Sequence, residues 1–390
     1  MNGAFSFRTI ACRFLPPLAV FALARLLIEA AVWRVSQTAN VKTWEWINLA
    51  RWDSGQYFLI AKKGYDLLPC GERYDDLEGW CGTAGWFPGY PCLIRLLSAV
   101  MEPLAAAVML SAFFHLGTLT LAWQWLRGNR TAKQSGLSKD GALLLMLGFF
   151  PGFIYHHAVF PVSMVTFFAF LFLRSVEGRP RPIAAGFSGI AAGLSYATGF
   201  LMTAAAGAWK LAEAWQSRSR REKWKTMLLG IYPAVGMGLV FVWHQLALGR
   251  WNAFFLVQRK FGHSLHFPLA TLADQLRLMS KTHGYEERVI GLQSFTVMIW
   301  VVLMAWFYRR AWKKNLTSPL ELGLFCMMVF YWLFPLLMGG GVSLYRAEAL
   351  LMPSVLLARY FPGWLRWAFL SGFVLLAFFM TELFIKGALK

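Results

Sequence analysis

The sequence predicts an all-α polytopic membrane protein, and three observations support this class. Of the 390 residues, 58% are hydrophobic and only 15% are charged, whereas soluble domains carry about 25% charged residues. Apolar runs of membrane-spanning length, roughly 20 residues each, recur along the chain. No stretch between them is long enough for a separate soluble domain, so we expect one integral-membrane domain over residues 1–390.

The basic residues are spaced as in a membrane protein. A net charge of +19 would suggest nucleic acid as a partner of a soluble protein, but here Lys and Arg lie in short segments between apolar runs. This is the positive-inside pattern, so we expect membrane lipids and no nucleic acid as partners. The basic segments are Arg8 to Arg13, Arg127 to Lys139, Lys210 to Lys225 and Arg309 to Lys314. These segments and the N-terminus are expected to be cytoplasmic, and the compact chain is typical of a bacterial inner-membrane protein.

The apolar runs predict the spanning helices in order. The first 33 residues could be a signal peptide, but Arg25 and Glu29 interrupt the run and no small-residue cleavage pattern ends it. We therefore expect a first membrane helix there. The predicted spans are 14–33, 103–126, 226–247, 291–308, 319–338 and 366–385. Further crossings between 141 and 208 and near 347–359 bring the expected total to about ten.

Residues 142–174 are long for one crossing and short for two, and Pro151 and Pro161 interrupt them. Residues 183–208 are interrupted by "GLSYATG". Because both flanking segments are basic, the number of crossings between them should be even. Either 142–174 is a hairpin and 183–208 is re-entrant, or each crosses once. Both alternatives place a protein-lined cavity nearby, since non-helical backbone at membrane depth requires one.

The first outer loop, residues 34–102, is the expected location of a functional site. It is far longer than most connections, and long loops are often functional. Two of its segments, Thr43 to Gly64 and Gly85 to Leu97, combine aromatic residues with spaced charges, which is typical of helices at the headgroup level. Between them lies an acidic segment flanked by Cys70 and Cys81. On an oxidising outer face, these two cysteines are expected to form a disulfide.

Asp53, in "RWDSGQYFLIAKKGY", has two interpretations. Asp followed three residues later by Gln56 is typical of a capping box, for a helix that begins at Ser54 and ends at Lys62, Lys63 and Gly64. Alternatively, a carboxylate held beside a hydrophobic cavity can act as a general base on a hydroxyl group. The two roles are compatible, because a capping position also fixes the carboxylate at a helix start.

Two motifs resemble those of a known family. "RWDSGQYFLIAKKGY" (51–65), followed by "WFPGYPCLIRLLS" (86–98), is similar to the signatures of the PIG-V-like mannosyltransferases, membrane glycosyltransferases of GT-C type. "GLSYATGFL" (193–201) and "SLYRAEALLMPSVLLARY" (343–360) are weaker echoes. The motifs cover about a tenth of the chain. Two departures stand out: Tyr196 and Ala197 replace the family's Arg-Pro step, and "VFPVSM" (159–164) lacks an acidic residue often found there.

The resemblance implies a GT-C bundle and an inverting transfer of a hexose, most often mannose, from a polyprenyl-phosphate sugar to a lipid or glycan acceptor. It implies Asp53 as the base that takes the acceptor proton. Arg51 and Arg346 are candidates to hold the phosphate, since a guanidinium bonds two oxygens at once, although Arg346 could instead snorkel to the headgroups. The aromatic residues of the motifs are the remaining candidates for substrate binding: Trp52, Tyr57, Tyr65, Trp86 and Tyr90.

The other polar residues give weaker signals. Arg25 and Glu29 lie one turn apart in the first span, where such charges are functional by default, but a mutually neutralising structural pair is preferred. No cofactor is expected. A divalent metal would need ligands such as Asp75, Asp76 and Glu78, or His263 and His266, and neither set converges in sequence. His156 and His157, near Pro161, are interpreted as polar groups at a kink.

Two other functions remain open. A transporter or flippase of a lipid-linked sugar would also have about ten spans and broken helices, but transporters usually contain two related halves, and no such repeat is visible. A catalytically inactive assembly subunit is compatible with the altered "SYATG" step. The aromatic, acid-bearing outer loop favours an enzyme.

Overall fold

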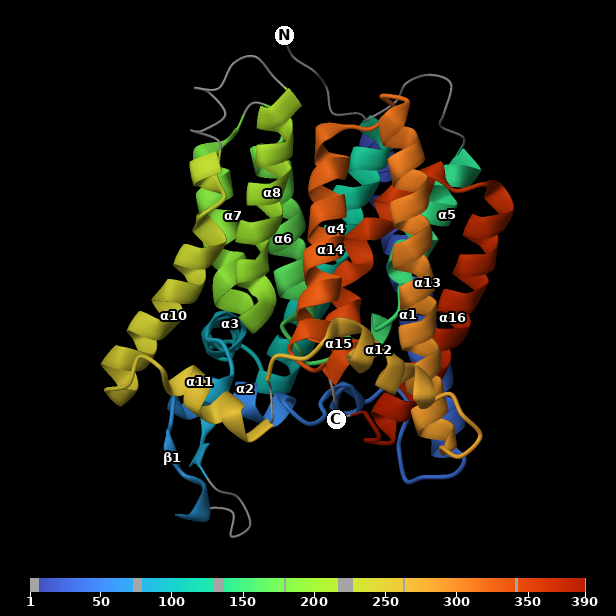
Figure 1. Cartoon of the computed structure of the whole chain (residues 1–390). Coiled ribbons are helices and arrows are strands. Elements are labelled where there is room, and N and C mark those ends of the chain that lie inside the picture. The colour runs from blue at the N-terminus through green and yellow to red at the C-terminus, as the bar shows by residue number, and fades with distance from the viewer. Residues whose placement is uncertain are drawn as a thin grey trace.

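The computed structural model describes residues 7–72, 79–128, 137–178, 180–216, 227–261, 264–340 and 343–389. Helices that run roughly parallel form a bundle, and short elements cover one end of it (Figure 1). We call this end, built mainly by residues 37–102, the loop end. The opposite end, where α4 ends at Gly128 and α13 ends at Lys313, is called the basic end.

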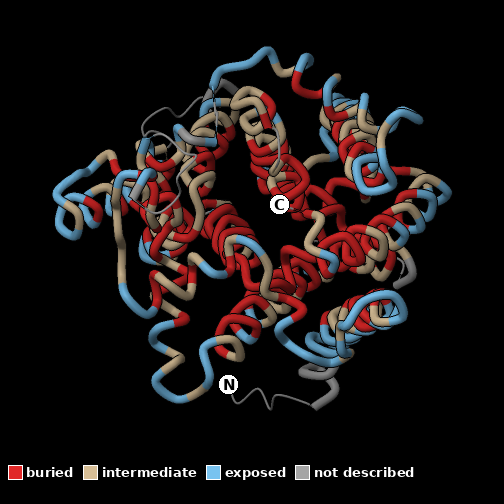
Figure 2. The backbone as a smooth tube through the Cα atoms, turned by 90° about the horizontal axis from the view of Figure 1, so that it is seen from below, coloured by how far each residue is buried: buried red, intermediate tan, exposed pale blue. Residues whose placement is uncertain are grey.

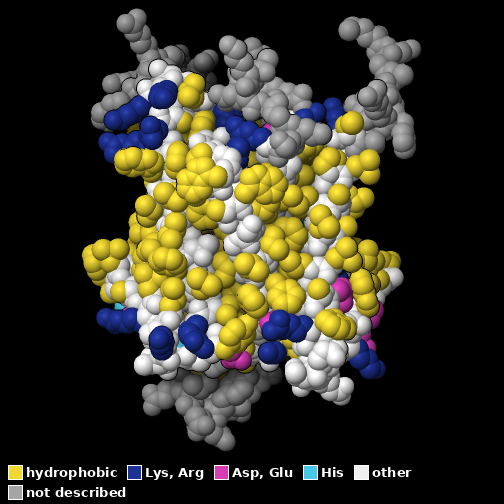
Figure 3. All heavy atoms as spheres, turned by 90° about the vertical axis from the view of Figure 1, so that its right-hand side faces the viewer, with side chains coloured by type: hydrophobic (Ala, Val, Ile, Leu, Met, Phe, Trp, Pro, Cys, Tyr) yellow, Lys and Arg dark blue, Asp and Glu magenta, His cyan; other side chains and the backbone are white. Residues whose placement is uncertain are grey.

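Six helices in the described residues are long and apolar enough to cross a membrane. They are α1 (Phe7–Ser36), α4 (Pro103–Gly128), the segment Met227–Leu248 with α10 (Tyr232–Leu248), α13 (Tyr285–Lys313), α14 (Pro319–Leu337) and α16 (Gly363–Ile385). Each coincides with one of the six predicted spans. Hydrophobic side chains cover the middle of the face in Figure 3, and Lys and Arg gather toward both ends. The chain is therefore an integral, multi-pass membrane protein, although the expected count of about ten spans is not confirmed.

The remaining apolar segments form shorter helices. These are α5 (Leu137–Gly148), η4 (Phe153–His156), α6 (Val162–Val176), α7 (Pro182–Ser195), η5 (Ala197–Phe200), α8 (Leu201–Gln216), α15 (Leu344–Glu348) and the 3₁₀-helix η8 (Ala349–Tyr360). The pairs α5–α6 and α7–α8 each turn back to the basic end (Figure 1). Each bend is a 3₁₀ turn, at η4 and at η5.

Short elements cover the loop end: η1 (Trp46–Leu49), α2 (Ser54–Lys63), β1 (Leu68–Pro69), η2 (Cys70–Glu72), β2 (Trp80–Cys81), η3 (Thr83–Gly85), α3 (Gly89–Leu97), α11 (Ala253–Gln258), η6 (Arg259–Phe261) and α12 (Pro268–Arg277). β1 and β2 pair antiparallel, with Leu68 opposite Cys81. The predicted disulfide between Cys70 and Cys81 is present. Both segments predicted to be interfacial are helical here, as η1 with α2 and as α3.

Viewed from the loop end, buried residues lie mostly toward the centre and exposed residues lie mostly at the rim (Figure 2). The C-terminal end of the chain reaches the middle of this view, and Ile385 and Leu389 are buried. One hydrophobic core includes residues from α1 through α16. The loop end is thus packed onto the membrane bundle and not suspended from it.

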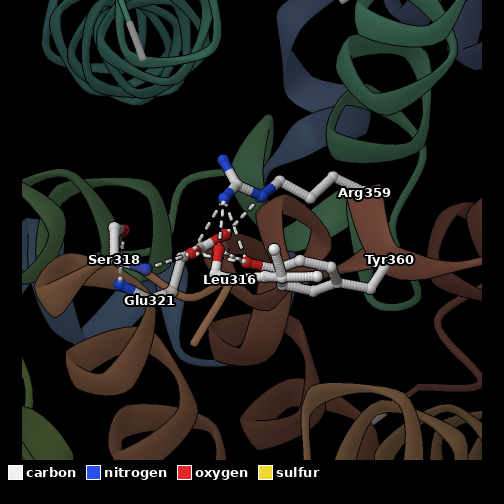
Figure 4. A network of polar contacts seen from close by, with 5 residues as sticks. All are labelled: Leu316, Ser318, Glu321, Arg359 and Tyr360. Atoms are coloured by element: carbon white, nitrogen blue, oxygen red, sulfur yellow. Dashed lines mark hydrogen bonds and ion pairs between the residues drawn. The ribbon is translucent and has the colours of Figure 1, made fainter. Parts of the chain in front are cut away.

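At the basic end, one polar network joins the start of α14 to the end of η8 (Figure 4). The fully buried Glu321 carboxylate pairs with Arg359 Nε at 2.7 Å and accepts the Tyr360 hydroxyl at 2.8 Å. It also accepts the backbone N–H of Ser318, at 2.7 Å, which completes a capping box. A buried carboxylate needs such partners, because desolvation without them is costly. The network fixes where η8 ends.

Glycines allow α7 and α10 to pack at close range. A side chain at Gly193 of α7 would overlap the backbone oxygen of Pro233, and one at Gly236 of α10 would overlap that of Ile190. Small residues at helix crossings let membrane helices approach closely, where van der Waals contact replaces the missing hydrophobic drive. The α7–α10 contact therefore depends on two glycines facing each other's backbone.

We expect Gly193→Ala to destabilise the protein by about 1 to 3 kcal/mol, because one added carbon overpacks a backbone contact. Gly238→Ala is the matched control. It lies on α10 with open space around it, and Ala favours helix over Gly. Thermal unfolding in detergent should show a lower midpoint for Gly193→Ala and an unchanged or higher one for Gly238→Ala. Equal midpoints for both variants would contradict the packing argument.

Candidate functional site

A tight turn at residues 51–54 precedes α2. Arg51 N–H donates to the Ser54 hydroxyl at 3.0 Å, and that hydroxyl donates to the backbone oxygen of Val159 at 3.1 Å. The N–H of Val159 in turn donates to Leu49 O at 2.9 Å. Trp52 has a positive φ of 48° and is half exposed. These bonds attach the turn to the bend of the α5–α6 pair.

Asp53 precedes α2 directly, but its side chain does not cap the helix. The helix spans Ser54–Lys63 and ends at Gly64 with φ +83°, as predicted. However, Asp53 makes no side-chain capping bond, so the predicted capping box with Gln56 is wrong. The carboxylate is turned instead toward Arg346 Nη1, with which it forms an ion pair. A charged partner outcompetes a backbone N–H for a carboxylate, because charge-assisted bonds are stronger.

Arg346 lies on α15 and is only 7% exposed. Its guanidinium carbon lies 5.1 Å from the ring centre of Phe160 and 5.7 Å from that of Tyr155, and the Tyr196 side chain lies within electrostatic reach of it. Burial lowers the pKa of the guanidinium, but the Asp53 carboxylate more than compensates, so the pKa is raised. The snorkelling alternative is therefore wrong: Arg346 points into the protein.

Tyr57 forms another wall of the site. It is buried on α2, and its ring packs edge-on against Tyr90, at 5.6 Å, and Phe160, at 6.1 Å. Burial, followed by the nearby Asp53 charge, raises the pKa of the Tyr57 hydroxyl well above its usual value. We call the set of Asp53, Arg346, Tyr57, Tyr155 and Tyr196 the Asp53–Arg346 site.

The other predicted site residues have structural partners. Arg51 donates to the backbone oxygens of Ile385, at 3.1 and 3.2 Å, and to Ile47 and Ala50, each at 3.0 Å. Its guanidinium therefore joins the turn to the C-terminal end of α16. A free C=O there carries the negative end of the helix dipole, which favours a cation. Arg51 therefore fixes the turn that carries Asp53, but it takes no part in the ion pair between Asp53 and Arg346.

Tyr65, Trp86 and Tyr90 also serve the packing of the loop. Tyr65 donates to Trp86 O at 2.8 Å and packs against His244. The Tyr90 hydroxyl bonds with Ala107 O and the Ser111 hydroxyl, both at 2.8 Å, and so attaches α3 to α4. Of the eight predicted residues, the structure thus brings three into the site, Asp53, Tyr57 and Arg346, with Trp52 adjacent in the chain.

Sequence reasoning missed Tyr155, Phe160 and the site role of Tyr196. Tyr196 was visible only as the replacement for an Arg, and nothing in the local pattern of Tyr155 distinguishes it from core aromatics. Gln293 of α13 was also missed. Its amide nitrogen donates to Glu348 Oε2 at 2.8 Å and to Tyr345 O at 3.0 Å, while its oxygen accepts Gly152 N–H at 3.2 Å. Gln293 therefore fixes α15 to the α5–α6 bend.

The weaker polar signals are mostly structural where the structure describes them. Glu29 lies 3.9 Å from Arg25 and accepts the Trp44 N–H at 2.8 Å, so the predicted pair joins α1 to the loop end. Within the described ranges, no group of three or more His, Cys, Asp or Glu could hold a metal ion. His266 bonds with the Ser264 hydroxyl. The other candidate ligands lie outside the described residues: Asp75, Asp76, Glu78 and His263.

A scan against models of protein families finds no match to this chain, and a search among curated proteins likewise finds none. The fold and the site define the class: an integral, multi-pass membrane protein with a buried guanidinium paired to a partly exposed carboxylate at the loop end.

We expect the Asp53–Arg346 pair to stabilise the fold. Asp53→Asn leaves the buried Arg346 charge without its counterion, which should cost about 3 kcal/mol. Arg346→Met added to Asp53→Asn removes that charge, so the double variant should regain much of the loss. Denaturant unfolding of the wild type, both single variants and the double variant measures the coupling. Additive losses would show that the two side chains do not stabilise each other.

Proposed function

We propose that the protein is an inverting glycosyltransferase that moves a hexose, most readily mannose, from a polyprenyl-phosphate sugar to an acceptor hydroxyl. One observation carries the proposal: an Asp at the start of an interfacial helix is paired with a buried Arg from a distant helix, inside a wall of tyrosines. This arrangement supplies the two charges that the reaction needs. The resemblance of residues 51–65 and 86–98 to the PIG-V-like motifs supports the same reaction.

Asp53 is the proposed base. Its side chain is 24% exposed, against 9% for Arg346, so an acceptor can reach the carboxylate while the guanidinium stays enclosed. In the reaction, the acceptor oxygen attacks the anomeric carbon, the bond from that carbon to the phosphate oxygen breaks, and the acceptor proton passes to Asp53. Polyprenyl phosphate leaves with the electron pair of the broken bond. No oxidant or other reactant is needed.

Arg346 is the proposed partner of the leaving phosphate. With no substrate bound, Arg346 is paired with the Asp53 carboxylate. A donor phosphate offers the guanidinium two oxygens in a matching plane, so Arg346 can transfer its bonds from the carboxylate to the phosphate. This exchange would free Asp53 as donor binds. It couples activation of the base to occupancy of the site.

The aromatic wall strengthens both roles. Tyr57 and Tyr155 are each 1% exposed, and charges act more strongly where water is excluded. The Tyr196 hydroxyl, at the position of the family's Arg, lies within electrostatic reach of Arg346. We propose that it keeps the guanidinium oriented once Asp53 releases it, so that one Arg serves where the family uses two.

We further propose that the loop end lies outside the cell membrane and the N-terminus inside, in a bacterial inner membrane. The basic connections at the other end support this orientation. Trp44, Trp46 and Trp52 are exposed at the loop end, and such residues favour the headgroup level. A membrane-embedded donor would therefore present its phosphate at the depth of the site.

A transporter of a lipid-linked sugar is the second candidate, favoured by the two broken pairs α5–α6 and α7–α8. Broken helices that meet at a polar site are a common feature of transporters. An inactive assembly subunit would retain the fold without the chemistry. Both alternatives predict the same outcome in a transfer assay: no product.

Asp53→Asn should lower transfer by about 10²- to 10⁴-fold, the range for loss of a general base. The assay combines purified protein, radiolabelled polyprenyl-phosphate mannose and a membrane lipid extract. Glu45→Gln replaces an exposed carboxylate in the same loop with a carboxamide. It is the control and should keep full activity. Equal transfer by wild type and Asp53→Asn would refute the base assignment. Absence of transfer by the wild type would favour one of the alternatives.

Arg346→Lys keeps the charge but loses the planar fork, so we expect transfer to fall by about 10²-fold or more, with a higher KM for the donor. Arg277→Lys, on an exposed side chain at the same end, is the matched control. Steady-state kinetics with donor varied at fixed acceptor separate the effects on kcat and KM. An Arg346→Lys variant with wild-type kcat and KM would exclude a bidentate contact to the leaving group.

A further inference from the structure

The basic end carries a cluster of cations that the proposed reaction does not use. Arg127 of α4, Lys139 of α5 and Arg366 of α16 lie within electrostatic reach of Asp140. Arg127 Nη1 lies 3.9 Å from Asp140 Oδ2. Arg359 of η8 and Arg366 both act on the charge of Lys139. Among the described residues, these four cations share two carboxylates, Asp140 and Glu321.

The two carboxylates cannot neutralise all four cations. Glu321 binds Arg359 through both Nε and Nη2, at 2.7 and 3.1 Å (Figure 4). Asp140 is shared by Arg127, Lys139 and Arg366. These three cations therefore carry more positive charge than Asp140 can neutralise. The Nη1 of Arg366 is buried, and within the described residues it has no hydrogen-bond partner. A buried guanidinium nitrogen without an acceptor is costly, so this part of the cluster favours an added anion.

The depth of the cluster indicates where that anion comes from. Trp364 and Trp367, which flank Arg366 on α16, are 72% and 55% exposed. Exposed tryptophans near a helix end mark the boundary between headgroups and hydrocarbon. Arg366 therefore lies at the level of lipid phosphates. Basic pockets between membrane helices on the cytoplasmic side are suited to anionic headgroups.

We propose that Lys139 and Arg366 form a binding site for the phosphate of an anionic phospholipid in the leaflet at the basic end. The phosphate accepts a hydrogen bond from Arg366 Nη1, and its negative charge neutralises that of Lys139. This relieves the repulsion between these two cations. The acyl chains lie along the apolar surface of α16 beside Trp367. The site is at the opposite end of the bundle from Asp53, so it does not rest on the proposed transfer reaction.

The test measures thermal unfolding of the full-length protein in detergent, titrated with four additives: phosphatidylglycerol, phosphatidylcholine, diacylglycerol and inorganic phosphate. Phosphatidylglycerol should raise the midpoint most. For Lys139→Gln/Arg366→Gln, the apparent affinity for phosphatidylglycerol should fall by about twenty-five-fold, roughly fivefold for each cation removed. Arg310→Gln/Lys313→Gln, which removes two cations from the end of α13 at the same face, is the matched control and should bind as the wild type does.

An equal loss in the test and control variants would overturn the site, since general charge attraction would then explain binding. Inorganic phosphate that stabilises as fully as phosphatidylglycerol would overturn the assignment to lipid. Should the test variant fail to fold, native mass spectrometry of the wild type decides the question. Phosphatidylglycerol must be retained in preference to phosphatidylcholine, and equal retention of both would overturn the proposal.

Discussion

The ion pair between Asp53 and Arg346 is the interaction on which the loop end depends. It joins residues 293 positions apart, one in the turn before α2 and one on a late, short helix. A buried Arg needs a counterion, and Asp53 supplies it only if the turn at residues 51–54 is held still. That turn is held by Ser54 bonding to Val159 O and by Arg51 bonding to Ile385 O. Three distant segments are thus required to place one carboxylate.

The broken helices follow from the same requirement. A continuous helix through residues 137–176 would use its backbone N–H and C=O groups in its own hydrogen bonds. It would leave none of them free to bind the loop end. The break at Phe149 to Pro161 instead frees Val159 to pair with Leu49 and places Tyr155 and Phe160 beside the guanidinium. Gln293 satisfies Gly152 N–H in the break and fixes α15 at the same time. Irregular backbone at membrane depth is tolerated where protein surrounds it in this way.

The two ends of the bundle differ in how a carboxylate paired with an Arg is surrounded. At the loop end, the pair is enclosed by tyrosines and its carboxylate is partly accessible, as the proposed exchange of partners requires. At the basic end, Glu321 is saturated by Arg359, Tyr360 and Ser318, an arrangement that locks η8 in place. The same chemistry, a carboxylate with an Arg, therefore serves a site at one end and a fixed joint at the other. Solvent access to the carboxylate makes the difference.

The sequence by itself determined the membrane class, the six long spans, the disulfide between Cys70 and Cys81 and the bounds of α2. Each of these is set by local composition or spacing: apolar length, loop charge, or a Gly after a helix. Asp53 and Arg346 were also visible as candidates, but not their pairing, because contacts between residues 53 and 346 leave no local pattern. Only the tertiary structure decided that Asp53 turns away from its helix, that Arg51 binds α16, and that Tyr155 and Tyr196 line the site. The reason is competition: each polar group takes the strongest partner within reach, and what is within reach is fixed by packing.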